Sequence, residues 1–132
     1  MSEHNQSLSG LFREPLPEKC PPVEATDISS LLTVYRLVES IPPSADDFAS
    51  HQAKKPHAKY PNPCKARGLS VLPTIAAAER TKKLPTLRHR TLLICTVRLV
   101  KDSGMILREG NEHWTWWPFA MCDVLACCEV MT

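Results

Sequence analysis

The apolar positions of this chain fall in short runs that prolines, glycines and polar residues interrupt, a pattern typical of β-strands. The first run covers residues 31–39, is rich in β-branched and aromatic side chains, and ends before Pro42. Residues 91–101 are mostly apolar on both alternating faces, which predicts a central strand covered on both sides. The other predicted strands are residues 69–72, 105–108, 112–117 and 124–130.

Two segments between these runs carry helix signals. Ser44, followed three residues later by Asp47, matches a capping box and predicts a helix over residues 45–54. A second helix is predicted over residues 75–83, where consecutive alanines favour helix formation and Thr74 precedes them as the N-cap. Prolines make the residues between the two helices an irregular loop up to the next strand.

Turn signals at residues 102–104 and 110–111 predict a three-stranded antiparallel meander over residues 91–117. With helices early and hairpins late, the element order predicts an α+β fold, a mostly antiparallel sheet with two short helices. Residues 1–30 are rich in proline and acids and cannot bury enough apolar area to offset their ordering entropy. We therefore expect a flexible N-terminal arm followed by a single α+β domain over residues 31–132.

Charge is distributed unevenly along the chain. Residues 51–90 contain ten lysines and arginines against one acid, Glu79, a local charge of +9, whereas the whole chain carries +2. Residues 1–50 and 91–132 are net acidic. Two interpretations follow: an anionic partner offsets the like charge of the basic stretch, or the acidic ends of the chain fold over it.

Length and composition indicate a small protein with one core. The chain has 132 residues and 43% hydrophobic content, and no apolar run reaches the length of a signal peptide or a membrane span. We expect a cytoplasmic protein without membrane association. The six cysteines show no Cys-x-x-Cys spacing, so they are predicted to be reduced thiols that hold no metal. The sequence offers one loose cluster of possible metal ligands, formed by His57 and Cys64 with His51 nearby.

All three tryptophans lie within four consecutive positions of one predicted strand. Strand alternation places Trp114 and Trp116 on one face and His113, Thr115 and Trp117 on the other. One face is expected to join the core. The other either packs inside as well or lines a ligand groove, where an exposed indole would stack on a nucleic-acid base.

Residues 64–70 form a predicted loop-to-strand entry with features of an anion site. Gly68 is expected to take a positive φ that lets a ligand approach the backbone, and Lys65 and Arg67 stand beside it. Ser70 follows in the strand, and the backbone amides at the start of the next helix favour a phosphate. The spacing is not that of a P-loop.

The order of Arg36 in the first strand, Ser70 in a short strand before an alanine-rich helix, and Glu129 in the last strand resembles the compact ADP-ribosyltransferase fold. One branch of that family uses an arginine, a serine and a glutamate from three such strands. The resemblance implies NAD as the cofactor, with Arg36 on its phosphates, Ser70 bracing the site and Glu129 on the ribose. His113 or Trp117 would contact the nicotinamide. The implied catalytic candidates are Glu129, Ser70 and His113.

The sequence supports three functional hypotheses. The leading one is a binding domain that holds a nucleotide or nucleic acid through the basic stretch and the tryptophan-bearing strand. The alternatives are an NAD-using enzyme similar to ADP-ribosyltransferases, and a protein-interaction or defence-accessory module that docks an acidic partner. If Arg36 serves only the fold, we expect it to pair with Asp46 or Asp47. The predicted ligand-binding residues are Arg36, Lys65, Arg67, Gly68, Thr115 and Trp117.

Overall fold

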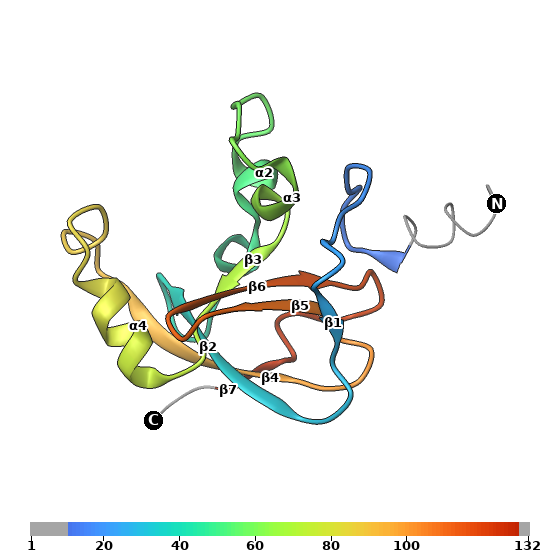
Figure 1. Ribbon diagram of the computed structural model, residues 1–132. Helices are drawn as coiled ribbons and strands as arrows, with labels where there is room; N and C mark the ends of the chain where they lie inside the picture. The colour runs from blue at the N-terminus through green and yellow to red at the C-terminus, as the bar shows by residue number, and fades with distance from the viewer. Residues whose placement is uncertain (1–10, 130–132) are drawn as a thin grey trace, which may run out of the picture.

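The computed structural model describes residues 11–129 and arranges the strands in two antiparallel sheets with a few short helices around them (Figure 1). The predicted α+β class is confirmed. The first sheet has the order β1-β5-β6-β3, with β1 (Thr26–Asp27), β5 (Gly104–Glu109), β6 (His113–Pro118) and β3 (Leu69–Val71). The second has the order β2-β4-β7, with β2 (Leu32–Val38), β4 (Leu93–Leu99) and β7 (Cys128–Glu129).

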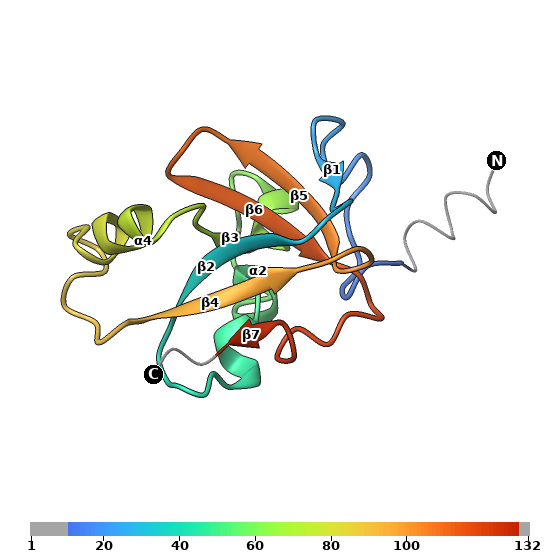
Figure 2. The same cartoon turned by 90° about the horizontal axis from the view of Figure 1, so that it is seen from below.

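The two sheets are joined along one edge and enclose the main core between them. Tyr35 in β2 and Leu72, just after β3, exchange two backbone hydrogen bonds of 2.9 and 2.8 Å. Seen from below, β2 and β4 lie in front of β3 and β6 (Figure 2). Apolar side chains from both sheets form one buried cluster, which stabilises strands that are too short to persist alone. Its strand members are Val34, Val38, Leu69, Val71, Cys95, Val97, Leu99, Ile106 and Trp116.

Residues 11–30 pack against the first sheet instead of forming the predicted arm. Phe12 forms a backbone bridge with Phe119, and Phe12 and Ala25 are buried in a second cluster with Trp117. The prediction failed because it counted only the apolar area of the segment itself, whereas a few of its side chains are anchored on a surface that the sheet provides. Residues 1–10 of the predicted arm lie outside the described part of the chain.

Four short helical segments connect the strands: the 3-10 helix η1 (Ala45–Phe48), α2 (His51–Lys54), α3 (Pro63–Ala66) and α4 (Ile75–Lys82). The predicted single helix over residues 45–54 is wrong, because Ala49 and Ser50 have extended backbone that separates η1 from α2. Ser50 starts the second segment by accepting a backbone N–H hydrogen bond of 3.0 Å. The predicted helix over residues 75–83 is confirmed, with Thr74 as its N-cap.

The β5–β6 hairpin confirms the later half of the predicted meander, but β4 does not join it. β4 pairs with β2 and, on its other side, with β7, so residues 100–103 carry the chain from one sheet to the other. It is the central strand of its sheet, as predicted, although Leu93 and Arg98 on it are exposed. Of the last strand, predicted over residues 124–130, residues 124–127 are not strand and β7 is, while residue 130 lies outside the described part of the chain. Within residues 11–129 no helix is long and apolar enough to cross a bilayer.

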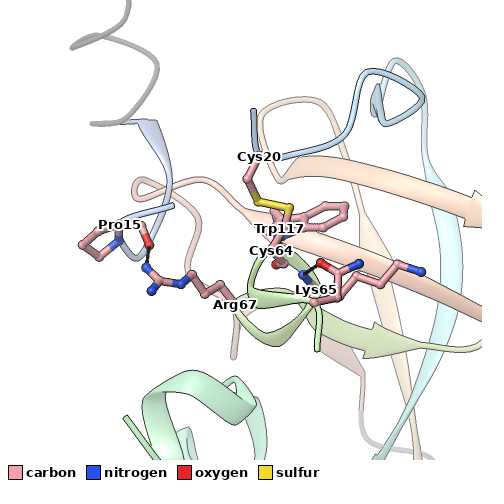
Figure 3. The surroundings of a disulfide bond; sticks show 7 residues. Pro15, Cys20, Cys64, Lys65, Arg67 and Trp117 are labelled. Atoms are coloured by element: carbon pink, nitrogen blue, oxygen red, sulfur yellow. Dashed lines mark hydrogen bonds between the residues drawn. A yellow bond between two sulfur atoms is a disulfide. The ribbon is translucent and has the colours of Figure 1, made fainter. Parts of the chain in front are cut away.

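Cys20 and Cys64 form a disulfide with their Cα atoms 5.6 Å apart, so the prediction of six reduced thiols is wrong (Figure 3). The bond follows from the packing of residues 11–30, which brings Cys20 to α3. Sequence spacing does not reveal such a pair, since the two cysteines are 44 residues apart. The free thiols are Cys95, Cys122, Cys127 and Cys128.

Candidate functional site

A concave site of about 230 Å³ lies where β2 meets β3, between α2 and the segment that ends α4 and follows it. In Figure 1, α2 and α4 flank these two strands. β2 and β3 each contribute one polar residue to the lining, α2 contributes two, and residues 81–90 contribute two more. Residues 39–50, between β2 and α2, contribute three more. We call this site the basic cleft, and its polar lining residues are Arg36, Glu39, Asp47, Ser50, His51, Lys54, Ser70, Thr81 and Arg90.

Three contacts hold the guanidinium group of Arg36 in the basic cleft. Its Nε donates a hydrogen bond of 2.9 Å to the backbone carbonyl of Asp47, and its Nη1 donates one of 2.7 Å to the backbone carbonyl of Ser70. The guanidinium carbon also lies 5.3 Å from the ring centroid of Phe48, within the range of a cation–π contact. Arg36 forms no ion pair with any carboxylate in residues 11–129.

The electrostatic surroundings of Arg36 leave its charge without a full counterion. Burial lowers the pKa of Arg36 to about 10, and the positive charge of Arg13 acts in the same direction, so the group is still protonated at neutral pH. The Asp47 carboxylate does not pair with Arg36. It accepts hydrogen bonds from the backbone N–H groups of Glu39 at 2.7 Å and Ser44 at 2.9 Å. Burial acts to raise the pKa of Asp47, but these hydrogen bonds outweigh it and lower the pKa. The expected Arg36–Asp47 pairing is thus made only through a backbone carbonyl.

Acidic residues from the two ends of the chain neutralise part of the basic stretch. Three ion pairs join the stretch to residues outside it: Lys65–Glu109, Arg80–Glu112 and Arg90–Glu39. The folding-over interpretation therefore accounts for some of the +9 charge. Lys54 is exposed and forms no ion pair with the described residues. Arg36 and Lys54 are thus the cations of the basic cleft that an anion would meet without displacing a carboxylate.

A second hollow of about 310 Å³ adjoins the basic cleft, and both are lined by His51, Gly68 and Ser70. We call it the side hollow. Its walls are more apolar than those of the cleft and include Tyr60, whose hydroxyl donates to the His51 carbonyl at 2.7 Å. A pocket with a charged end and an apolar end suits a ligand that combines a charged group with a ring.

His113 lines the side hollow together with Lys65. Burial lowers the pKa of His113, and the charge of Lys65 acts in the same direction against the opposing charge of Glu109. These effects favour the neutral form of the imidazole. A neutral imidazole offers one hydrogen-bond donor and one acceptor to a ligand and adds no charge to the side hollow.

The two hollows bring together six of the nine predicted site residues, from four elements or the turns beside them. This meeting follows from the strand order, in which β3 pairs with β6 and continues into the bridge to β2. Ser70 and Thr115 lie directly opposite each other in the register of β3 and β6. The six residues are Arg36, Lys65, Gly68, Ser70, His113 and Thr115.

Gly68 is needed for close packing and does not have the predicted positive φ. Positive φ values occur at Gly104 and Gly110 among the glycines of the described chain. A Cβ atom on Gly68 would lie 2.5 Å from the Thr115 methyl carbon and 3.1 Å from Nε1 of Trp117. Glycine therefore allows the chain before β3 to approach the side chains of β6.

Two predicted ligand-binding residues, Trp117 and Arg67, lie away from both hollows. Trp117 is 1% exposed and its Nε1 donates to the Cys64 carbonyl at 2.9 Å, so its ring offers no stacking surface. Arg67 donates from Nη1 to the Pro15 carbonyl at 2.6 Å (Figure 3). Its Nε is buried and has no hydrogen-bond partner among the described residues. On the second face of the tryptophan-bearing strand, Trp117 is thus covered by residues 11–30, whereas His113 and Thr115 line the side hollow.

Glu129 lies on the opposite face of the second sheet from Arg36. In the strand register Arg36 of β2 pairs with Cys95 of β4. Glu129 of β7 pairs with Thr96, the next residue of β4. Since successive side chains of a strand point to opposite faces, the two groups cannot meet. Glu129 is exposed and pairs with Arg98 at 2.9 Å. The arginine, serine and glutamate set that the family resemblance implies is therefore not brought together.

Sequence reasoning did not assign to a ligand site several residues that line the two hollows, among them His51, Lys54, Tyr60 and Arg90. All four belong to the basic stretch, but only the fold shows which of its members converge.

Across residues 11–129 no group of three His, Cys, Asp or Glu side chains is arranged to hold a metal. Cys64, from the loose cluster noted in the sequence, is bonded to Cys20.

No protein-family model, curated protein or solved structure matches this chain. The resemblance to ADP-ribosyltransferases stays a prediction. The interpretation of the site therefore depends on its geometry and charge.

Proposed function

We propose that this protein binds a nucleotide-sized ligand, with a phosphate group in the basic cleft and the ring system in the side hollow. The observation that carries the proposal is the Arg36 guanidinium, a partly buried charge bonded only to backbone carbonyls and without a carboxylate partner in the described chain. A buried charge without a counterion is costly, and a bound anion offsets that cost. Lys54 and the Ser70 and Thr81 side chains line the same site.

The way Arg36 is held suits recognition of phosphate. Its Nε and Nη1 atoms are fixed by carbonyl oxygens, while Nη2 donates to no residue of the described chain. The planar group is therefore presented in one orientation at little further entropic cost. Charge-assisted hydrogen bonds from an oriented guanidinium to phosphate oxygens are among the stronger contacts in proteins.

The shape of the site favours a nucleotide over a nucleic-acid strand. Binding pockets for small ligands commonly have volumes of roughly 300–1,000 Å³, a range that the basic cleft approaches and the side hollow reaches. A single-stranded nucleic acid would instead use exposed aromatic platforms along an open groove. Trp116 and Trp117 are fully buried, and the partly exposed Trp114 ring is covered by Arg108.

The cytoplasmic location and the two alternative functions also stay proposals. The cytoplasmic location is in tension with the Cys20–Cys64 disulfide, since reducing compartments disfavour such bonds. Docking of an acidic protein partner would use cations outside the cleft, for example Lys82 and Lys83, which form no ion pairs with the described residues. NAD remains a ligand to include in binding tests, because it carries both phosphates and rings.

We expect ATP, AMP and NAD to bind more tightly than inorganic phosphate, and expect Lys54→Ala to weaken nucleotide binding by about tenfold. The loss of one charge-assisted contact corresponds to roughly 1.5 kcal/mol or more. Isothermal titration calorimetry at low ionic strength measures the effect, and affinity should fall as salt is added. Arg36→Gln should abolish binding, with circular dichroism checking that this buried substitution leaves the fold intact.

The matched control is Lys55→Ala, which removes the same charge one residue further along. Lys55 is exposed and does not line the basic cleft, so affinity should be unchanged. Equal weakening by both substitutions would show a diffuse charge effect and contradict the proposed site. Tight binding of a single-stranded oligonucleotide that ATP does not displace would contradict the preference for a nucleotide.

A further inference from the structure

A separate cluster of thiols lies at β7, away from the basic cleft. Cys122, Cys127 and Cys128 line an open hollow of about 590 Å³, and each is partly exposed. The sulfur atoms of Cys122 and Cys127 are 3.6 Å apart. A disulfide requires about 2.05 Å between the sulfurs, so a small movement of the two side chains is enough to form the bond.

The backbone between the two cysteines favours their approach. Residues 123–128 form successive turns, with the Ala126 N–H bonded to the Asp123 carbonyl at 3.0 Å and the Cys127 N–H to the Val124 carbonyl at 3.3 Å. These turns fold the chain back, so that side chains five positions apart face each other. The Arg98 N–H donates to the Cys127 carbonyl at 2.8 Å and anchors this end of the turns to β4.

The neighbouring thiols are oriented differently. The Sγ atom of Cys128 donates to the Val124 carbonyl at 3.5 Å, and Cys95 is fully buried with its Sγ 3.6 Å from the Thr96 carbonyl. Adjacent cysteines in a chain seldom reach disulfide geometry. Cys122 is therefore the natural partner of Cys127.

The two thiols of the pair differ in acidity, which assigns them different roles. Hydrogen bonds from Cys122 and Ser103 lower the pKa of Cys127 to about 7, although burial opposes the shift. The same contact with Cys127, together with burial, raises the pKa of Cys122. Cys127 is thus the more acidic thiol of the pair, and the thiolate is the attacking form in exchange reactions.

We propose that Cys122 and Cys127 form a reversible dithiol–disulfide site that reacts with small disulfides in the open hollow. The Cys127 thiolate attacks one sulfur of the incoming disulfide, forms a mixed disulfide and releases one small thiolate. Cys122 then loses its proton to the released thiolate and attacks the Cys127 sulfur, which expels the second small thiolate, and solvent protonates it. The protein pair is oxidised by two electrons, and the small disulfide is reduced to two thiols. This site is independent of the nucleotide proposal.

The test uses the full chain, oxidised glutathione and peptide mapping by mass spectrometry. We expect the wild-type protein to lose two hydrogens beyond the Cys20–Cys64 bond, with the new link between residues 122 and 127. Cys122→Ser should instead retain one glutathione at Cys127, because the resolving thiol is missing. Cys127→Ser should react at least about tenfold more slowly, since it lacks the more acidic thiol.

Cys128→Ser is the matched control, since it removes a neighbouring thiol from the same hollow. It should form the 122–127 link at the wild-type rate. A link between residues 127 and 128, or no new link while both thiols remain open to alkylation, would overturn the proposal. Accumulation of glutathione on Cys122 instead of Cys127 would overturn the assigned roles.

Discussion

Replacing Gly104 with alanine should lower the free energy of unfolding by about 3 kcal/mol or more. Gly104 has a φ of +144°, which side-chain-bearing residues rarely adopt, and such strain costs roughly 1–3 kcal/mol. A Cβ atom there would also lie 2.2 Å from the Trp117 carbonyl oxygen and 2.8 Å from Nε1 of Trp116. Overpacking of this kind adds roughly 1–3 kcal/mol. The clash falls where β5 begins opposite Pro118, and the Trp116 indole donates to the Ser103 carbonyl at 3.1 Å.

Urea unfolding, followed by tryptophan fluorescence, measures the change as a lower midpoint at an unchanged slope. Gly110→Ala is the matched control, because Gly110 also has a positive φ, +75°, but no atom lies within 4 Å of the position that an added Cβ would take. It should cost only about 1–2 kcal/mol, the penalty of left-handed backbone for an L-residue. Equal losses at the two positions would show that the close packing around Gly104 does not contribute.

The elements that the sequence predicts correctly are those whose signals are local. Thr74 and the alanines after it define α4, and the turn at residues 110–111 defines the β5–β6 hairpin. Each signal operates within a few residues, so neighbouring chain segments do not change it. The split of residues 45–54 into two short helices shows the limit, since the capping preference of Ser50 competes with that of Ser44 within one apparent helix.

Arrangements that depend on distant segments were not predictable. Nothing in residues 91–101 shows whether this strand pairs with the next strand in a hairpin or with β2, about sixty positions earlier in the chain. The burial of Trp117 on the second face of β6 depends on residues 11–30, whose composition alone indicates disorder. For the same reason Trp117 appeared available to a ligand, although it is covered in the fold.

The candidate site shows the same division between local and distant information. The uneven charge pointed to residues 51–90. The family resemblance placed Arg36 with Ser70, and the loop-to-strand entry placed Gly68 beside Ser70; all three line the basic cleft. The face of the sheet on which Glu129 lies was not predictable. A shift of one residue in the pairing of β4 with β7 would move its side chain to the other face. Both hollows depend on α3 and the chain after it, which the Cys20–Cys64 disulfide ties to the N-terminal segment.

Loss of the Cys20–Cys64 disulfide should lower the free energy of unfolding by about 2–4 kcal/mol, the typical effect of a native bond. The two cysteines are 44 residues apart, so the bond removes much conformational entropy from the unfolded chain. It also holds Cys20 in the cluster around Trp117, whose indole donates to the Cys64 carbonyl. The double substitution Cys20→Ser with Cys64→Ser should therefore lower the melting temperature by roughly 10 °C.

Calorimetry with and without dithiothreitol separates this bond from the other thiols. The reductant should destabilise the wild-type protein and leave the Cys20/Cys64 double variant unchanged. A second double variant, Cys122→Ser with Cys127→Ser, retains the Cys20–Cys64 bond and should respond to the reductant as the wild type does. If full reduction, verified by mass spectrometry, leaves the wild-type melting temperature unchanged, the bond does not stabilise the fold. In that case the packing of Phe12 and Ala25 alone would hold residues 11–30 on the sheet.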